Sequence, residues 1–191
     1  MPRIVDAEQR RDDITSAAAR VIARAGIEAA TMREVAAEAG WTTGVLTHYF
    51  ADKRELLLAT FEASLSKRRS LRPTTELMSR AQQLRHSLEG ALPLDDERRR
   101  HWMVTLACCS HAVGDPRLAA AQTAGYREFR DHVTLQVSES GWSRGDPRTT
   151  AERLIALVDG IAMQALFDPT SWPPQRQLAA LDAELGAAAS V

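Results

Sequence analysis

Apolar residues recur at helical spacing along most of the chain, and no stretch alternates with the two-residue period of a β-strand. The first such segment is expected from about Asp6 to Ala25, and Gly26 just beyond it is typical of a helix end. Its apolar stripe consists of Ile14, Ala17, Ala18, Val21 and Ile22. The pattern predicts an all-α protein that opens with a long amphipathic helix.

Two much shorter apolar sets follow, one on each side of a glycine. Thr31 is placed to cap a helix that ends at Gly40, and Glu34 has the spacing to close a capping box with Thr31. Either of the next two threonines can cap a second short helix that ends near Phe50. Two short helices joined by a glycine turn form a helix-turn-helix, whose second helix can enter the major groove of DNA. An ordinary helical corner fits the same pattern, and both interpretations remain open at this point.

Six further helical segments are expected, separated mainly by glycine and proline. They cover residues 52–73, 73–90, 93–113, 116–141, 149–167 and a last stretch from 174. Asp52 and Glu55 have the spacing of a second capping box at the start of the first of them. The segment Thr149–Phe167 is apolar on more than one face, so it needs cover from its own domain or also from another subunit.

The charge balance gives little support to nucleic-acid binding. The 191 residues include 24 basic and 25 acidic ones, for a net charge of −1, and residues 1–60 alone hold eight basic and nine acidic residues. A DNA-binding function therefore needs locally placed arginine and lysine. The two cysteines are adjacent, at Cys108 and Cys109, which disfavours a disulfide and fits a reducing compartment. Without a signal sequence or a membrane-spanning run, a soluble cytoplasmic protein is expected.

Three motifs carry a specific family resemblance. The sequence Thr-Met-Arg-Glu-Val-Ala-Ala-Glu-Ala-Gly covers residues 31–40, Gly-Val-Leu-Thr-His-Tyr-Phe covers 44–50, and Asp-Lys-Arg-Glu-Leu covers 52–56. Their order and spacing resemble the DNA-binding signature of TetR-family transcriptional regulators, most closely the BetI-type branch. The run from Leu154 to Pro169 also resembles the C-terminal domain of that branch.

The resemblance implies a fold and a division of labour. Residues 1–51 would form a three-helix DNA-binding head, and residues 52–191 a helical domain for ligand binding and dimerisation. The implied protein is a ligand-responsive regulator, expected to be a repressor, that binds a palindromic operator as a homodimer and is released by a small molecule. No enzymatic activity, cofactor or membrane partner is expected. The sequence leaves open the effector, the operator, the target genes and any redox role of the cysteines.

The resemblance also assigns roles to individual residues. Those expected to read bases are Thr43, Gly44 and Thr47, and those expected to hold phosphates are Thr42, His48, Tyr49 and Lys53. Thr31 would cap the supporting helix near the DNA backbone, and Arg33 would reach a phosphate or a base. The chain has Thr47 where many relatives carry a tyrosine, and Trp41 where they carry a small aliphatic residue. Both departures leave the operator sequence open.

The C-terminal assignments are coarser. Candidate residues for a mostly apolar ligand pocket are Trp102, Leu106, Cys109, Tyr126, Phe129 and Met163, each of which also fits plain core. Candidate dimer-interface residues are Leu154, Leu157, Val158, Ile161, Leu178 and Leu181. Aromatic residues could enclose a choline-type cation, although effectors differ within the branch.

Three alternative functions draw on other features of the sequence. A metal site would have to draw on His101, Cys108, Cys109, His111 and His132, but adjacent helical residues point about 100° apart, so no metal is expected. An enzyme is not expected, because no nucleophile–base or paired-carboxylate arrangement is recognisable. A helical dimerising adaptor without sequence-specific DNA binding is the remaining alternative. Thr43, Gly44 and Lys53 argue against it, because a core does not need them.

Overall fold

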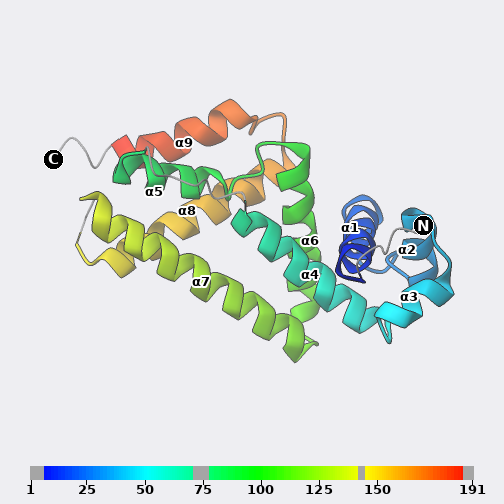
Figure 1. Ribbon diagram of the computed structural model, residues 1–191. Helices are drawn as coiled ribbons and strands as arrows, with labels where there is room; N and C mark the ends of the chain where they lie inside the picture. Colours follow the sequence, from blue (N-terminus) through cyan, green and yellow to red (C-terminus); the bar gives the residue numbers. More distant parts are fainter. Residues whose placement is uncertain (1–6, 71–77, 142–144, 187–191) are drawn as a thin grey trace. The chain divides into compact units, whose positions relative to one another are not determined.

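The computed structural model describes residues 7–70, 78–141 and 145–186. Within these ranges the chain forms nine helices and no strand, which confirms the all-α prediction (Figure 1). The helices are α1 (Ala7–Ala25), α2 (Met32–Ala39), α3 (Thr43–Tyr49), α4 (Lys53–Ser70), α5 (Arg80–Glu89), α6 (Asp96–Ala112), α7 (Pro116–Ser140), α8 (Pro147–Phe167) and α9 (Pro174–Gly186). None of these helices is long and apolar enough to cross a membrane.

The helices group into two compact units, each with its own core. Unit one comprises the described residues up to Lys67 together with Met103–Gln122, and unit two comprises the remaining described residues. Helices α6 and α7 therefore each contribute one end to unit one and the other end to unit two. The units do not coincide with the predicted boundary after residue 51, because α4 and the end of α6 share a core with α1–α3. The division of function at that boundary stays a prediction.

The helix-turn-helix forms through the expected local signals. The hydroxyl of Thr31 accepts a hydrogen bond from the Glu34 amide at 3.1 Å and so caps α2. Gly40 ends α2 at φ 74°, and the amides of Gly40 and Trp41 donate to the carbonyls of Ala37 and Ala36, which is a Schellman motif. In the predicted capping box the Thr31 amide would donate to the Glu34 carboxylate. It donates instead to the Ala29 carbonyl at 2.8 Å, because the preceding turn already supplies an acceptor.

Helix α4 starts with a variant of the predicted capping box. The carboxylate of Asp52 accepts from the Glu55 amide at 2.8 Å, as expected. The carboxylate of Glu55 accepts from the Ala51 amide at 2.8 Å, one residue before the predicted partner. Asp52 therefore satisfies an amide that the first turn of α4 would leave without an acceptor, and Glu55 satisfies one that precedes the helix.

Two helix starts differ from those the sequence pattern indicates. The segment after α4 was expected to begin at Pro73, which lies outside the described residues; α5 begins at Arg80, where Ser79 and Gln82 form a capping box. Helix α8 begins at Pro147, two residues before the expected start, because Asp146 caps it by accepting from the Thr149 amide at 2.8 Å. The remaining predicted ends lie within about three residues of the observed ones.

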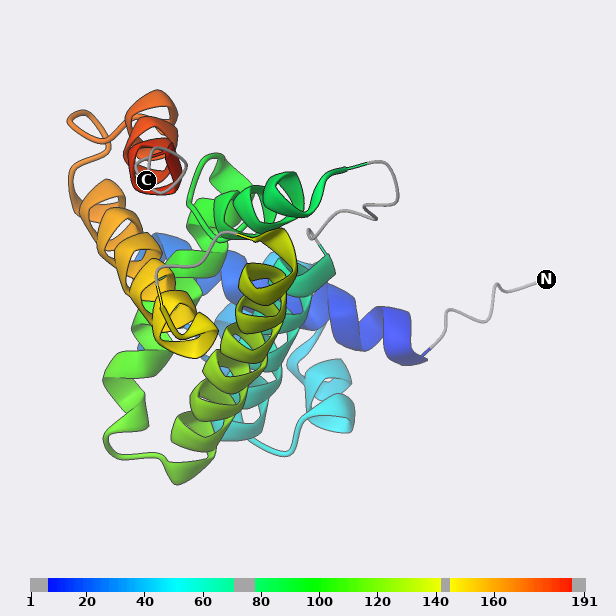
Figure 2. The ribbon, with the colours of Figure 1, turned by 90° about the vertical axis from the view of Figure 1, so that its left-hand side faces the viewer.

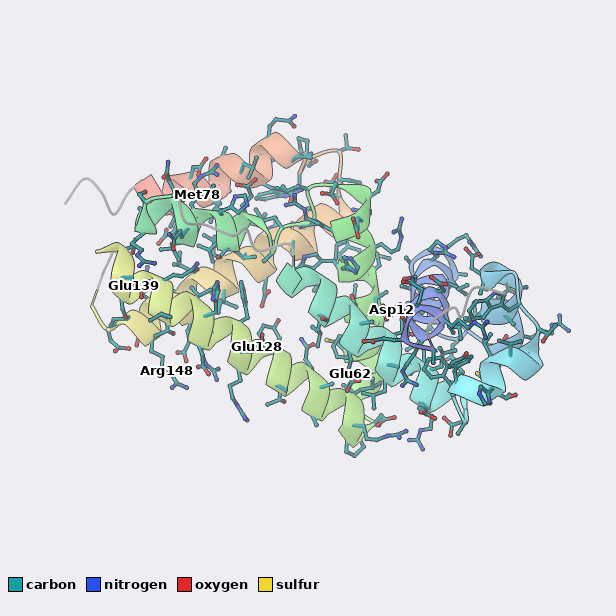
Figure 3. All side chains as sticks on the ribbon, in the orientation of Figure 1. Asp12, Glu62, Met78, Glu128, Glu139 and Arg148 are labelled. Atoms are coloured by element: carbon teal, nitrogen blue, oxygen red, sulfur yellow. The ribbon has the colours of Figure 1, made fainter. Side chains whose placement is uncertain are left out.

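Unit two consists of helices packed around α8. Helices α5, α8 and α9 contact one another in pairs, and the views agree that α8 and α9 lie side by side (Figures 1 and 2). Their core includes Leu84, Leu88, Leu154, Val158 and Leu181, all nearly or fully buried. Charged side chains such as Glu128 of α7 and Arg148 of α8 are exposed on the surface (Figure 3).

Candidate DNA-binding surface

Helix α3 has one buried side and one exposed polar side. Leu46 is fully buried in the core of unit one, and Phe50, just beyond the helix end, is buried in the same core. The exposed side carries the residues predicted to read or hold DNA. They are Thr42, Thr43, Gly44, Thr47 and His48. The i, i+4 spacing of 43 with 47 and of 44 with 48 aligns them along the helix.

The hydroxyl groups on this side are not equivalent. Thr47 Oγ1 donates to the Gly44 carbonyl at 3.0 Å, so its hydrogen is used within the helix while its methyl group stays exposed. Thr42 occupies the N-cap position of α3 with extended backbone, yet its side chain makes no capping hydrogen bond. The amides of Val45 and Leu46 donate instead to the Thr42 carbonyl, so the Thr42 hydroxyl is not used to cap α3.

The end of α3 is fixed by an arginine from α1. Arg11 Nη1 donates to the Tyr49 carbonyl at 3.0 Å, and its guanidinium lies 4.4 Å from the ring centroid of Phe50. The same side chain lies 4.0 Å from the carboxylate of Glu55 on α4. A cation at a helix C-terminus also interacts favourably with the helix dipole. Arg11 therefore positions α3, a role that the sequence pattern did not indicate because the partners are 38 or more residues away.

The remaining predicted contacts of the head lie on α2 and beside α3. Thr31 and Arg33 are both exposed and line one surface hollow of about 590 Å³. Because the Thr31 hydroxyl only accepts its capping bond, its hydrogen remains available to a phosphate oxygen. Tyr49 is half-buried, and its ring meets that of His48 edge to face with centroids 5.2 Å apart.

Lys53, the first residue of α4, is tied to the loop between α1 and α2. Its ammonium donates to the Glu28 carbonyl at 3.1 Å and lies 3.6 Å from a Glu28 carboxylate oxygen. The other carboxylate oxygen is 3.0 Å from His111 Nε2 at the end of α6. The hydrogen bond with His111, followed by the charge of Lys53, lowers the pKa of Glu28. Sequence reasoning missed Glu28, since a lone glutamate in a loop carries no motif.

A second ion cluster joins α2 to α1. Glu38 accepts from Arg20 Nε at 2.7 Å and from Arg24 Nη1 at 3.1 Å. These two hydrogen bonds, Arg20 first, lower the pKa of Glu38. The helix that supports α3 is therefore held to α1 by charge as well as by the apolar contacts of Val35 and Ala36.

The predicted ligand-pocket residues divide between the two units. Leu106 and Cys109 belong to unit one, and Trp102, Tyr126, Phe129 and Met163 to unit two. In unit two, Trp102 Nε1 donates to the Ala91 carbonyl at 2.7 Å, and the Tyr126 hydroxyl donates to Asp159 at 2.7 Å. Phe129 is buried, whereas Met163 is 39% exposed. The role of these residues in a pocket stays a prediction.

The predicted dimer residues lie largely inside unit two. Leu154, Val158, Ile161 and Leu181 are at most 3% exposed and belong to the core of unit two itself. Leu157 and Leu178 are half-buried against the same core. These four side chains are thus covered within the chain itself, and the pattern of apolar positions does not distinguish core contacts from interface contacts. Their role in a dimer stays a prediction. The outer faces of α8 and α9 carry different residues.

The histidines and cysteines considered as metal ligands do not gather. Among the described residues, no group of three or more histidine, cysteine, aspartate or glutamate side chains could hold a metal ion. His132 Nε2 lies 3.2 Å from the Ser87 hydroxyl, and His111 binds Glu28. Burial, with a smaller effect from Cys109, raises the pKa of Cys108 to about 12, so this thiol stays protonated at neutral pH.

Two protein-family models match the chain. Residues 14–60 match the model for bacterial regulatory proteins of the TetR family, which covers the helix-turn-helix and the first turns of α4. Residues 80–189 match the model for the C-terminal part of BetI-type transcriptional repressors. The second match alone covers more than half of the chain.

Individual proteins agree with these models. The HTH-type transcriptional regulator PksA of Bacillus subtilis is 32% identical over 174 residues, which cover 88% of this chain and 84% of that protein. A transcriptional regulator of Rhodococcus has a solved structure with a TM-score of 0.84 and 29% identity, covering 93% of this chain and 94% of its own. A regulator of Saccharomonospora viridis, crystallised with choline, shares the fold with a TM-score of 0.85 at 20% identity, over 94% and 96% of the two chains. This chain belongs to the TetR family of bacterial transcriptional regulators and carries a BetI-type C-terminal region.

Proposed function

We propose that this regulator is a repressor that binds a palindromic operator as a homodimer and leaves it when a small molecule binds the C-terminal region. The observation that carries the proposal is the exposed polar side of α3, which is fixed at one end by Arg11 and supported on the other side by a buried core. Such a rigid, exposed helix of small polar residues suits entry into the major groove. Operator binding would take place in the cytoplasm.

Residues on this surface have two kinds of proposed role. Thr43, Gly44 and Thr47 read base edges, and the lack of a side chain at Gly44 lets the helix approach the groove closely. Thr42, His48, Tyr49 and Lys53 hold phosphates, with Thr31 and Arg33 contributing from α2. Phosphate contacts set the register of the protein on the duplex, and base contacts supply the sequence preference.

The proposed dimer surface is the outer face of α8 and α9. On α8 the exposed residues Ala156, Gly160, Met163 and Phe167 form a stripe at helical spacing, and Phe167 is 72% exposed. On α9, Ala179 and Ala183 are exposed in the same manner. Small residues let two helices approach closely, and large exposed apolar ones gain most from burial. A dimer of this kind would present two α3 helices to two half-sites of one operator.

A quaternary ammonium compound is the first effector class to test. The Saccharomonospora viridis regulator of the same fold was crystallised with choline. Aromatic ring faces attract such cations, and Trp102, Tyr126 and Phe129 supply three rings in unit two. Because the polar atoms of Trp102 and Tyr126 already have partners, their rings rather than their N–H and O–H groups would contact a ligand.

A gel-shift titration tests the function. The protein should retard a fragment from the region upstream of its own gene, and the affinity should fall steeply as salt rises. Lys53→Ala should weaken binding to every fragment by a similar factor, because a phosphate contact carries no sequence information. Arg54→Ala is the matched control, since Arg54 is paired with Asp115. Failure to retard any genomic fragment at low salt would favour the dimerising adaptor instead.

A further inference from the structure

The ammonium of Lys53 already has acceptors in the protein without DNA. Both the backbone carbonyl and the carboxylate of Glu28 are within 3.6 Å of it. The Glu28 side chain is 83% exposed, and the Lys53 side chain is 32% exposed. A phosphate that approaches Lys53 would therefore meet a partly exposed ammonium group that already contacts a carboxylate.

A phosphate diester and the Glu28 carboxylate cannot both use Lys53 fully. Each carries a negative charge, and the lowered pKa of Glu28 keeps its carboxylate ionised at neutral pH. Like charges brought to one cation repel each other, and the exposed carboxylate can swing away only by giving up its bond to the lysine. We propose that Glu28 competes with operator phosphate for Lys53 and so sets the DNA affinity of this regulator. The inference rests on the proposed DNA-binding function.

His111 determines how strongly Glu28 competes. Its Nε2 lies 3.0 Å from the Glu28 carboxylate, and its Nδ1 lies 3.2 Å from the Ala107 carbonyl. This contact engages one carboxylate oxygen of Glu28, and the other oxygen is the one that lies 3.6 Å from Lys53. Loss of the His111 contact leaves the carboxylate to Lys53 alone. His111 therefore favours DNA binding without touching DNA.

The contact between His111 and Glu28 joins the end of α6 to the loop between α1 and α2. His111 lies in the last turn of α6, within unit one, and α6 begins in unit two among residues that match the BetI-type C-terminal model. Glu28, Lys53 and His111 also line one cavity of about 380 Å³, together with Arg54 and Asp115.

The chain offers a control of equal charge for the test. Asp115 lines the same cavity but is paired with Arg54 at 3.4 Å and not with Lys53. Glu28→Gln and Asp115→Asn each remove one negative charge from the cavity, so long-range electrostatics change equally. Only the first substitution removes the charged competitor for Lys53. A difference in DNA affinity between these two variants that is lost when Lys53 is replaced therefore reports competition for Lys53.

The experiment is an anisotropy titration of a labelled duplex of random sequence at low salt, since a phosphate contact is independent of sequence. Glu28→Gln should bind about two- to fivefold more tightly than Asp115→Asn, the range expected for one exposed ion pair. The difference should vanish when Lys53→Ala is added to both. His111→Ala should weaken binding in the unsubstituted protein and have no effect in the Glu28→Gln background.

The possible outcomes distinguish failure of the competition, of the role of His111 and of the proposed function. Equal affinities of Glu28→Gln and Asp115→Asn, or an advantage that persists without Lys53, would overturn the competition while leaving the proposed function intact. An effect of His111→Ala that is equally large in both backgrounds would overturn the role of His111. If the unsubstituted protein binds neither this duplex nor any genomic fragment, the proposed function itself fails, and the competition fails with it.

Discussion

Thr47 has already donated its hydroxyl hydrogen to the Gly44 carbonyl, so it can present to DNA a methyl group and an accepting oxygen. This narrows what the residue can recognise. An acceptor on a base edge, such as guanine N7, would not gain a hydrogen bond from it. A thymine methyl would pack well against its own methyl group.

Substitutions at Thr47 distinguish the contribution of its methyl group from that of its hydroxyl oxygen. Thr47→Val keeps the methyl group and removes the hydroxyl, so affinity for the preferred operator should stay within about twofold. Thr47→Ala removes the methyl contact and should cost about 0.8 kcal/mol, roughly fourfold in affinity, at one operator position. Binding titrations against operators substituted one base pair at a time would measure this. A large loss with valine would show that the oxygen, and not the methyl group, makes the contact.

Glu38 gives a prediction about pH. Its pKa is lowered in the folded protein by Arg20 and then Arg24, so its contribution to stability is present above the usual glutamate pKa. That contribution is lost as the pH falls through the lowered folded value. Thermal unfolding followed across the acid range should show a smaller decline in the Glu38→Gln variant than in the unsubstituted protein. Identical declines would mean that the two arginines contribute nothing measurable.

At the scale of the helix, α3 has seven residues and depends on its neighbours for its position. Isolated helices of this length are not stable in water. Leu46 buries one side of the helix in the core, Thr42 occupies its N-cap, and Arg11 donates to a carbonyl at its C-terminal end. The position of α3 therefore depends on α1 as well as on its own residues.

Replacement of Arg11 tests this dependence. Arg11→Ala should cost about 1 kcal/mol of stability, the range for an exposed cation–π contact with one hydrogen bond, and should weaken DNA binding as well. Arg11→Lys should not restore binding, because an ammonium does not reproduce the planar contact with Phe50 and the bond to Tyr49 together. Chemical denaturation and DNA titration of both variants would show it, with Arg10→Ala as the control for charge. Full recovery of stability and DNA binding in Arg11→Lys would show that only the positive charge at this position matters.

At the scale of the whole molecule, the outer face of α8 and α9 is the proposed dimer surface, with Met163 and Phe167 exposed on it. Two substitutions there, Met163→Glu and Phe167→Glu, should shift the protein from dimer to monomer without unfolding it, since both side chains are already exposed. Sedimentation would give the oligomeric state, and circular dichroism the helix content. Leu135→Glu on α7, where the leucine is 57% exposed, is the matched control. An unchanged dimer would require a different interface.

Much of this protein follows from its sequence. Caps such as Thr31 and Asp52, together with glycine and proline stops, depend on residues within a few positions of one another, so local rules locate most helix ends. The motif around Thr43 and Lys53 likewise identifies the family, because its spacing is local. The pattern could not show which acceptor the Thr31 amide would use or which amide would donate to the Glu55 carboxylate, because several nearby groups compete.

The tertiary structure alone decided the contacts between distant residues. Arg11 with Tyr49, and His111 with Glu28, join positions 38 and 83 residues apart, and exposed polar side chains carry no periodic signal of their partners. Burial of Leu154 and Leu181 in the core of unit two was equally undetermined, since an apolar residue has the same pattern whether a neighbouring helix or a second subunit covers it. The sequence by itself determined the helices, the helix-turn-helix and the family, because local spacing encodes them. Only the packed chain decided which charges meet and which apolar faces stay open.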